Sequence, residues 1–421
     1  MGFKPILSPK NMPTIRDSFD QPSLLEKLYR ANKSEFKKSF EELYPEIKGH
    51  PIAETWKARL DYWKPNFNWG LKKDRIFLAS LIFLAGILAN IPFLMDWDTD
   101  LFFEKNIGFF LFSFMSLLFI YLSPSKKPII IFSVVTVMGG LYINLAPFGS
   151  SSVTFQLVLV HLGLVLVGIT GLAWLGDHIS SLQKRIEMVK FGANLIIITG
   201  LLTLAFGLMT AMTFGLYEAI GLDIELVFST IILPTIGPSI PLISGFILFH
   251  NPKIINQITG MIAKLFTPLA CLVLLSFIWF YWTGNQDPFE NREALLIFNV
   301  ILIAALVLIF FSVINIQENN NHSAAILILI LNTLALTINI VALLGIVYRL
   351  NTYGITPNRM AILGSNILIL TTLGFTLISL LKVIAQKKNI VNVGLVMVKF
   401  LPIYLAWFAI VAITWPLFFG F

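Results

Sequence analysis

Polar side chains inside long apolar stretches are the first residues of this sequence that could do chemistry. They comprise one histidine, His161, and seven asparagines: Asn90, Asn144, Asn194, Asn299, Asn332, Asn339 and Asn366. A histidine titrates near neutral pH and could carry a proton, and an ionisable group within a membrane is a functional candidate. No Asp or Glu lies mid-stretch to pair with His161. The alternative is a neutral histidine that, like the asparagines, forms hydrogen bonds between helices.

A proline-rich stretch is the second candidate. It reads Leu-Pro-Thr-Ile-Gly-Pro-Ser-Ile-Pro over 233–241, with Pro234, Thr235, Gly237, Pro238, Ser239 and Pro241 as candidate residues. Prolines at this density remove amide donors and predict a helix broken within the membrane. Broken spans form substrate sites in many transporters, and hydroxyls would line such a site. The alternative is a kinked but continuous helix whose freed carbonyls bond neighbouring hydroxyls.

A short polar loop over 348–359 is the third candidate. It contains Arg349, Tyr353, Gly354, Thr356, Asn358 and Arg359. Gly354 can end a helix in the left-handed conformation, and Thr356 can cap a helix that starts at Pro357. Arg359 would then lie in a first turn, where the helix dipole disfavours a cation. Compensation by an anion is expected, from a lipid phosphate, an acidic ligand or one of Asp223, Glu225, Glu290 and Glu293. A purely structural corner is the alternative.

The same loop resembles a known family. Tyr353-Gly354-Ile355-Thr356-x-Asn358-Arg359, preceded by Arg349, is similar to the signature of bacterial polytopic membrane proteins catalogued as domain of unknown function 4153. Leu25-Glu26-Lys27-Leu28-Tyr29 and the stretch from Trp56 to Tyr62 also resemble this family, whose members place a small helical segment before the spans. The resemblance implies a bacterial inner-membrane protein and brings no activity with it.

Motifs for catalysis and metal binding are absent from the sequence. It has no Walker loop, no nucleophile elbow and no cluster of metal-ligating residues. Asp96, Asp98 and Asp100 form an acidic loop that is interpreted as a solvated turn, although a metal site or a transferase could use such carboxylates. The single cysteine, Cys271, excludes an intrachain disulfide. We therefore expect no enzyme, cofactor or metal.

The elements that must position these residues are membrane spans. Of 421 residues, 57% are hydrophobic and 13% are charged, about half the roughly 25% typical of soluble proteins. A span needs about 20 apolar residues. Charges, prolines and polar clusters divide the chain into eleven such stretches, over 76–95, 106–122, 128–146, 154–175, 189–214, 225–249, 264–284, 294–314, 324–347, 360–383 and 396–419. In the fifth, a stripe of small residues, Thr203, Gly207, Ala211 and Gly215, predicts close helix packing.

Positive charge predicts the orientation of these spans. With the N-terminus inside, the inner loops contain 11 Lys and Arg residues between 126 and 399, and the outer loops contain 4. This places the N-terminus in the cytoplasm and the C-terminus outside. The basic inner face could also bind anionic lipid headgroups.

The N-terminal part predicts a separate helical unit. Residues 1–22 are rich in proline and predict a flexible arm, 23–72 an amphipathic cytoplasmic or interfacial unit, and 73–421 the transmembrane domain. Residues 1–75 hold 15 basic and 10 acidic side chains, and this interleaving argues against nucleic-acid binding. The aromatic faces could pack on the membrane surface or on one another.

The sequence thus predicts an all-α, polytopic transmembrane bundle, and the family resemblance implies a bacterial inner membrane. Transport or flipping of a small or amphiphilic molecule is the first functional hypothesis, with the proline-rich span and His161 near the pathway. The second is a non-catalytic sensor or assembly subunit that binds a protein partner or forms a homo-oligomer. In that case the 349–359 corner would bind outside and the N-terminal unit inside.

Overall fold

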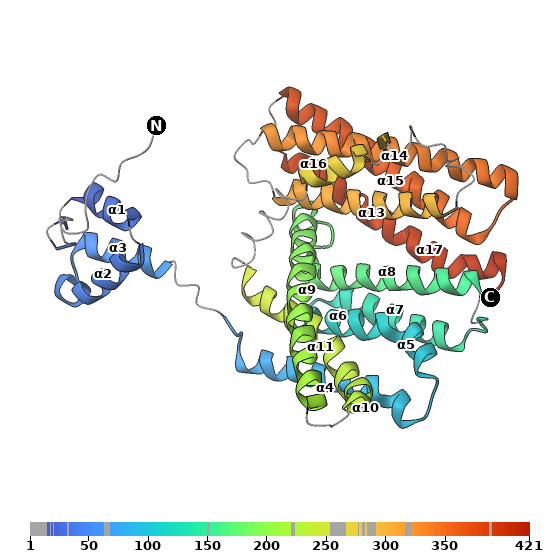
Figure 1. Cartoon of the computed structure of the whole chain (residues 1–421), viewed down its shortest axis with the longest axis horizontal. Coiled ribbons are helices and arrows are strands. Elements are labelled where there is room, and N and C mark those ends of the chain that lie inside the picture. The colour runs from blue at the N-terminus through green and yellow to red at the C-terminus, as the bar shows by residue number, and fades with distance from the viewer. Residues whose placement is uncertain are drawn as a thin grey trace. The chain divides into compact units, whose positions relative to one another are not determined.

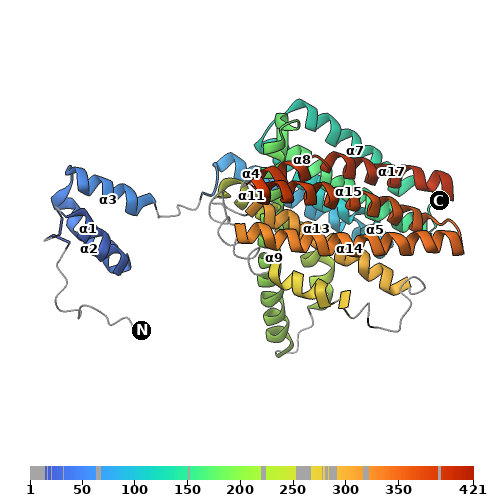
Figure 2. The same ribbon diagram turned by 90° about the horizontal axis from the view of Figure 1, so that it is seen from above.

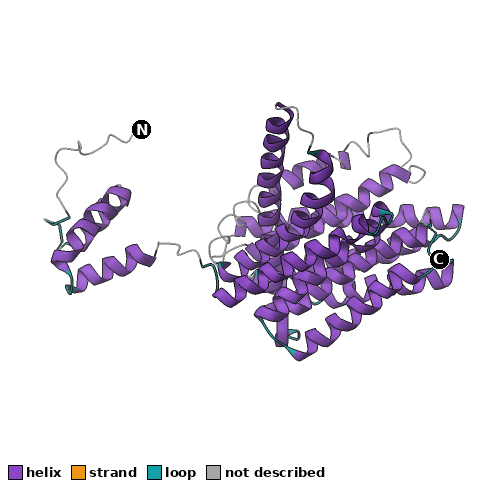
Figure 3. Ribbon diagram, turned by 90° about the horizontal axis from the view of Figure 1, so that it is seen from below, coloured by secondary structure: helices purple, strands orange, loops and turns teal. Residues whose placement is uncertain are grey.

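A computed structural model gives the fold of two compact units, 1–67 and 68–421. The structure describes residues 15–16, 18–19, 21–31, 33–62, 68–149, 152–219, 224–252, 267–276, 278–279, 283, 292–315, 322–386 and 390–421. Within these ranges the chain is helical and contains no strand (Figure 3). The all-α prediction is confirmed.

The first unit consists of three helices, α1 (Pro22–Ala31), α2 (Lys33–Ile47) and α3 (Pro51–Tyr62) (Figure 1). Their apolar faces bury one another, with Leu25, Phe40 and Trp56 in a common core. The Trp56 ring lies 4.9 Å from the ring of Phe36 between centroids. These helices therefore pack their apolar faces against one another within the unit, which is the alternative to packing on the membrane surface.

A salt bridge on the surface of this unit joins α1 to α3. Arg59 contacts Glu26 at 2.7 Å, and its guanidinium lies over the Trp56 ring at 4.6 Å. Glu26 also accepts a hydrogen bond from Arg30 at 2.7 Å. The hydrogen bonds from Arg30 and then Arg59 lower the pKa of the Glu26 carboxyl, because both stabilise its charged form.

The second unit contains the membrane spans. Its elements begin with α4 (Lys72–Leu94), α5 (Thr99–Gly108), the π-helical turn η1 (Phe109–Ser113), α6 (Phe114–Leu122), α7 (Lys126–Leu145), α8 (Val153–Leu175) and the short η2 (Gly176–His178). They continue with α9 (Leu182–Ala219), α10 (Glu225–Val227), the π-helical η3 (Phe228–Ile232), α11 (Leu233–His250), α13 (Arg292–Asn315), α14 (His322–Tyr353), α15 (Pro357–Gln386), α16 (Val391–Val398) and α17 (Leu401–Phe419).

Nine helical segments of the described chain are long and apolar enough to cross a membrane. They coincide with nine of the eleven predicted spans. In the other two, the described residues form shorter apolar helices, Thr267–Ser276 and Phe298–Ile314. The chain is a multi-pass membrane protein by helix length and hydropathy. The total of eleven stays a prediction.

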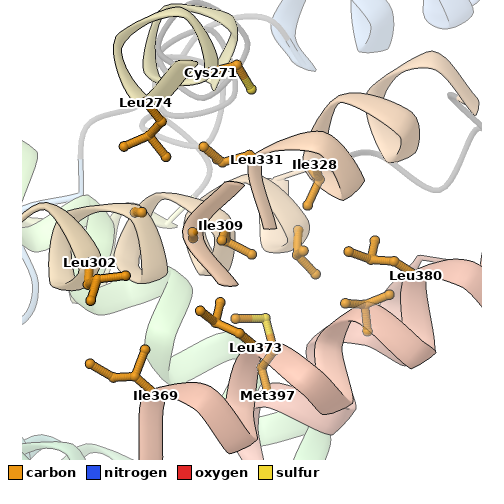
Figure 4. Close-up of a cluster of buried hydrophobic side chains, with 14 of the residues drawn as sticks. Cys271, Leu274, Leu302, Ile309, Ile328, Leu331, Ile369, Leu373, Leu380 and Met397 are labelled. Carbon is orange, nitrogen blue, oxygen red and sulfur yellow. The ribbon is translucent and has the colours of Figure 1, made fainter. Parts of the chain in front are cut away.

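Two buried clusters organise these helices. One gathers aliphatic side chains from Thr267–Ser276 and from α13, α14, α15 and α16 (Figure 4). The other joins α4, α6 and α11 around Leu118 and Phe246. α8 and α17 lie side by side, with Leu405 of α17 packed against Gly168 of α8.

α9 departs from the common direction. In Figures 1 and 2 it runs across the direction shared by α8, α13, α14 and α15. Its 38 residues make it about 57 Å long, well beyond the roughly 30 Å of a hydrocarbon core. Thr203, Gly207 and Ala211 are exposed, and a Cβ added at Gly207 would meet nothing within 4 Å. The predicted close packing of this stripe is therefore wrong at these residues, because no helix of the described chain covers that face.

Contacts between loops agree with the predicted alternation of spans. Ser125, after the second span, donates a hydrogen bond to Asp177, after the fourth, at 2.6 Å. At the opposite end, Thr154 donates to the carbonyl of Gly420 at 2.8 Å. Each pair joins loops that were predicted on the same side. Which side is cytoplasmic stays a prediction from the positive charge.

Candidate functional site

The proline-rich span is a continuous helix and not a broken one. Residues from Glu225 to His250 are helical throughout, and Pro238 and Pro241 lie inside α11. The prediction of a break is therefore wrong, and the alternative of a continuous helix describes the structure. The π-helical turn η3 ends at Ile232, two residues before Pro234.

Hydroxyl groups of this span bond its own backbone. Thr235 Oγ1 donates to the carbonyl of Ile231, and Ser239 Oγ donates to that of Thr235, both at 2.7 Å. Thr235 also accepts a hydrogen bond from Asn90 of α4 at 3.2 Å. Gly86 allows this close approach, because a Cβ there would lie 2.9 Å from Cγ2 of Thr235. Thr235 thus holds α4 against α11, and Ser239 bonds the backbone of its own helix.

The 348–359 loop is the tight corner that the sequence predicts. Gly354 has φ +78° and donates its amide to the carbonyl of Leu350 at 3.0 Å, which ends α14. Thr356 Oγ1 accepts from the amide of Arg359 at 3.4 Å, and α15 starts at Pro357. Both helix ends are therefore confirmed.

Arg359 finds its compensation in the backbone. Its guanidinium donates to the carbonyls of Tyr353 at 2.9 Å and Gly354 at 2.6 Å, which form the negative end of α14. The Tyr353 ring lies 5.3 Å from the guanidinium of Arg349 and 5.7 Å from that of Arg359. Nearby, Trp415 donates to the carbonyl of Pro357 at 2.8 Å.

These contacts bear on the anion expected at the corner. The side chains of Asp223, Glu290 and Glu293 lie outside the described residues. The carbonyls at the end of α14 already balance the dipole of α15 at Arg359. This geometry favours the structural interpretation of Arg359. Asn358 is half-buried.

His161 is buried in α8 and bonds its own helix. Its Nδ1 lies 2.8 Å from the carbonyl oxygen of Leu157, and its ring meets the edge of Phe408 of α17 at 6.0 Å between centroids. Nδ1 therefore carries a hydrogen that it donates to this carbonyl. Asn194 is buried in α9, a different helix from those that carry Asn332, Asn339 and Asn366.

Three buried asparagines lie on the α14–α15 pair. Asn332 and Asn339 of α14 are fully buried, and Asn366 of α15 is 1% exposed. Among the described residues, Asn332 Oδ1, both polar atoms of the Asn339 side chain and Asn366 Nδ2 have no hydrogen-bond partner. Buried polar groups are nearly always satisfied, so each of these atoms calls for an explanation. We name this group the amide cluster.

The register of α14 against α15 brings two members of the amide cluster, Asn339 and Asn366, to the same level, and Asn332 lies two turns away, about 10 Å along α14. Asn332 Nδ2 donates to the carbonyl of Leu373 at 3.1 Å. Asn339 follows Asn332 by seven residues, and Asn366 precedes Leu373 by seven, in two helices that run in opposite directions. Seven residues are two helical turns, so both steps keep the same face and the same rise. Asn339 and Asn366 therefore lie within about one turn of each other along the pair.

A further polar contact was missed in the sequence. Asp74, at the start of α4, lies 3.7 Å from Nε2 of His250 and accepts from the Tyr121 hydroxyl at 3.3 Å. Asp74 also accepts from the amide of Leu71 at 3.0 Å, which caps α4. The available signal was that all three side chains fall at span ends predicted on the same side. Within the described chain, no group of three or more His, Cys, Asp or Glu side chains could hold a metal ion.

The chain was compared with known proteins of three kinds. No family model, curated protein or solved structure matches the chain.

Proposed function

We propose that this protein moves a small or amphiphilic molecule across the membrane, along a path that passes the amide cluster. The observation that carries the proposal is the set of amide atoms without a partner in Asn332, Asn339 and Asn366. We propose the α14–α15 pair for this path, whereas the sequence analysis expected it near the proline-rich span and His161.

The cost of an unpaired amide supports this proposal. A polar group buried without a partner costs about 1–3 kcal/mol, and lipid offers no hydrogen bonds. Asn339 lies 14 residues before the end of α14 at Tyr353, about 21 Å along the helix and so deep in the span. At that depth, water or a polar molecule in passage can supply the missing partner. Amides that are open to a passing polar molecule support a transport path.

Cysteine accessibility tests the path without knowledge of the substrate. Cys271 is the only cysteine, so Cys271→Ala provides a cysteine-free chain. In that background, Asn339→Cys and Asn366→Cys are each exposed to a membrane-impermeant maleimide. We expect both to react, because a hydrated path admits the reagent and supports the thiolate.

Two control variants make this labelling specific. Leu302→Cys tests the fully buried aliphatic core, and Ile340→Cys tests a neighbouring position of α14 that is 46% exposed within the chain and faces lipid. Neither should react, because neither position meets water. Failure of Asn339→Cys and Asn366→Cys to react, in a chain that elutes as a single species, would show that the amide cluster is dry and would overturn the proposal.

A sensor or assembly subunit is the second candidate, and the separate core of the 1–67 unit favours it. A unit that folds on its own can bind a cytoplasmic partner without disturbing the spans. Deletion of residues 1–67 should then abolish a co-purifying protein while the membrane unit remains folded. The pair Arg349→Ala and Arg359→Ala tests an outer partner in the same way. If neither change removes a protein, this candidate fails.

A further inference from the structure

We infer that the amide cluster takes an uncharged group that both donates and accepts hydrogen bonds, such as the hydroxyls of a polyol. This inference rests on the proposed function and names the class of molecule for the same site. It is carried by the balance of donors and acceptors and by where the charged residues of α14 and α15 lie.

The unpartnered atoms are of both kinds. Asn339 Nδ2 and Asn366 Nδ2 are donors, whereas Asn332 Oδ1 and Asn339 Oδ1 are acceptors. The amide of Asn332 is oriented by its bond to the Leu373 carbonyl, so its oxygen points away from that bond. A carboxylate or phosphate would leave the two oxygens unpaired, and an ammonium group would leave the two NH2 groups unpaired. A hydroxyl donates and accepts, and so satisfies both.

No charge on α14 or α15 lies close to the amide cluster along either helix. The charged residues described in these helices are Arg349, Arg359 and Lys382. Arg349 follows Asn339 by ten residues, about 15 Å, and Arg359 precedes Asn366 by seven, about 10 Å. Arg359 is also bonded to the carbonyls that end α14. Lys382 follows Asn366 by sixteen residues, about 24 Å.

The aliphatic side chains around the asparagines disfavour an ion and accommodate a polyol. Leu331, Ala335, Ile338 and Ala342 surround the asparagines on α14 and are almost fully buried in the aliphatic cluster shown in part in Figure 4. An ion without a counter-charge in such surroundings loses far more solvation energy than a neutral hydroxyl. The carbon skeleton of a polyol fits aliphatic walls, and its hydroxyls match the amides.

Osmotic uptake into proteoliposomes tests this class directly. The full chain is reconstituted and mixed with a hyperosmotic solution of erythritol, choline chloride or sodium gluconate, and vesicle volume is followed by stopped-flow light scattering. We expect erythritol to enter faster than into protein-free vesicles, whereas the two salts do not. Asn339→Leu and Asn366→Leu should each abolish the excess rate.

Further variants guard against loss of fold. Asn144→Leu removes an amide that is paired with Asn106 at the end of another span, and it should keep the erythritol rate. Asn339→Ser keeps one donor and one acceptor, and it should retain part of the excess. Each variant is used only after it elutes as a single species.

The outcomes separate this inference from the proposed function. Amide-dependent entry of choline chloride or gluconate would overturn the uncharged class and leave transport standing. Entry of no osmolyte beyond protein-free vesicles, together with labelling at Asn339→Cys, would also overturn the class alone. Absence of both uptake and labelling would overturn both.

Discussion

Replacing two asparagines of the amide cluster by leucine should make the protein more stable. In the wild type, Asn339 buries two polar atoms without a partner in the described chain and Asn366 buries one. Leucine has no polar atom to satisfy, so Asn339→Leu with Asn366→Leu removes three such atoms. A site kept for a ligand costs stability in the empty protein, and removal of that cost is the expected effect of the double change.

The size of the gain follows from the same count. At about 1–3 kcal/mol for each atom, three atoms would give several kcal/mol, but hydrogen bonds in membrane proteins average only about 0.6 kcal/mol and water can enter the site. We therefore expect about 1 kcal/mol for each amide and about 2 kcal/mol for the double change. At about 2–4 °C per kcal/mol for domains of 150–250 residues, and less for a longer chain, Tm should rise by a few degrees.

The assay is thermal unfolding in detergent at one fixed heating rate, because membrane proteins often unfold irreversibly. Asn90→Leu is the matched control, since its amide donates to Gly86 at 2.7 Å and to Thr235 at 3.2 Å. This control should lower Tm. If the double variant loses as much stability as Asn90→Leu, the amides of Asn339 and Asn366 are ordinary interhelical bonds and the reasoning is refuted.

Three other changes test separate parts of the fold. Gly364→Ala should cost about 1–3 kcal/mol, seen as a lower Tm, because its Cβ would stand 2.0 Å from Cζ2 of Trp407; Gly200→Ala, with nothing within 4 Å, should be neutral or stabilising. Arg359→Ala should lower Tm by an amount corresponding to about 1 kcal/mol, because the carbonyls that end α14 lose their donor; an unchanged Tm would contradict this cap. The contribution of Glu26 to the 1–67 unit should be complete above pH about 4.3 and fall as pH drops below it, because its pKa is lowered in the fold. The protection of α1 against hydrogen exchange should decrease as pH falls through this range, and Glu26→Gln should remove this pH dependence.

Elements fixed by local chemistry could be predicted from the sequence. The corner at Gly354 is the clearest case, because a glycine that ends one helix and a Thr-Pro pair that starts the next need no information from distant residues. Spans are predicted equally well by length and apolar composition. The two ends of the corner and nine of the spans follow from these rules alone.

Predictions that depended on a neighbouring helix fared worse. Prolines in the sixth span predicted a break, but the segment from Glu225 to His250 is a continuous helix, in which Thr235 contacts Asn90 of α4. The small stripe around Gly207 predicted a packed face, but no described helix lies on it. Whether the stripe around Gly207 is packed depends on the presence of a second helix on that face. A pattern read along one span does not contain that information.

The asparagines show the same limit and explain why the candidate site could be predicted only in part. Asn90, Asn144 and Asn339 are equivalent in the sequence, since each is an amide in an apolar span. Asn90 meets a threonine and Asn144 meets Asn106, so these two act as bonds between helices. Asn339 meets no partner among the described residues. The residue type thus predicts that burial of the amide costs free energy. The neighbouring helix decides whether a hydrogen bond offsets that cost. An amide becomes a candidate site only where this cost is not met, and Asn339 on α14 and Asn366 on α15 fulfil this condition.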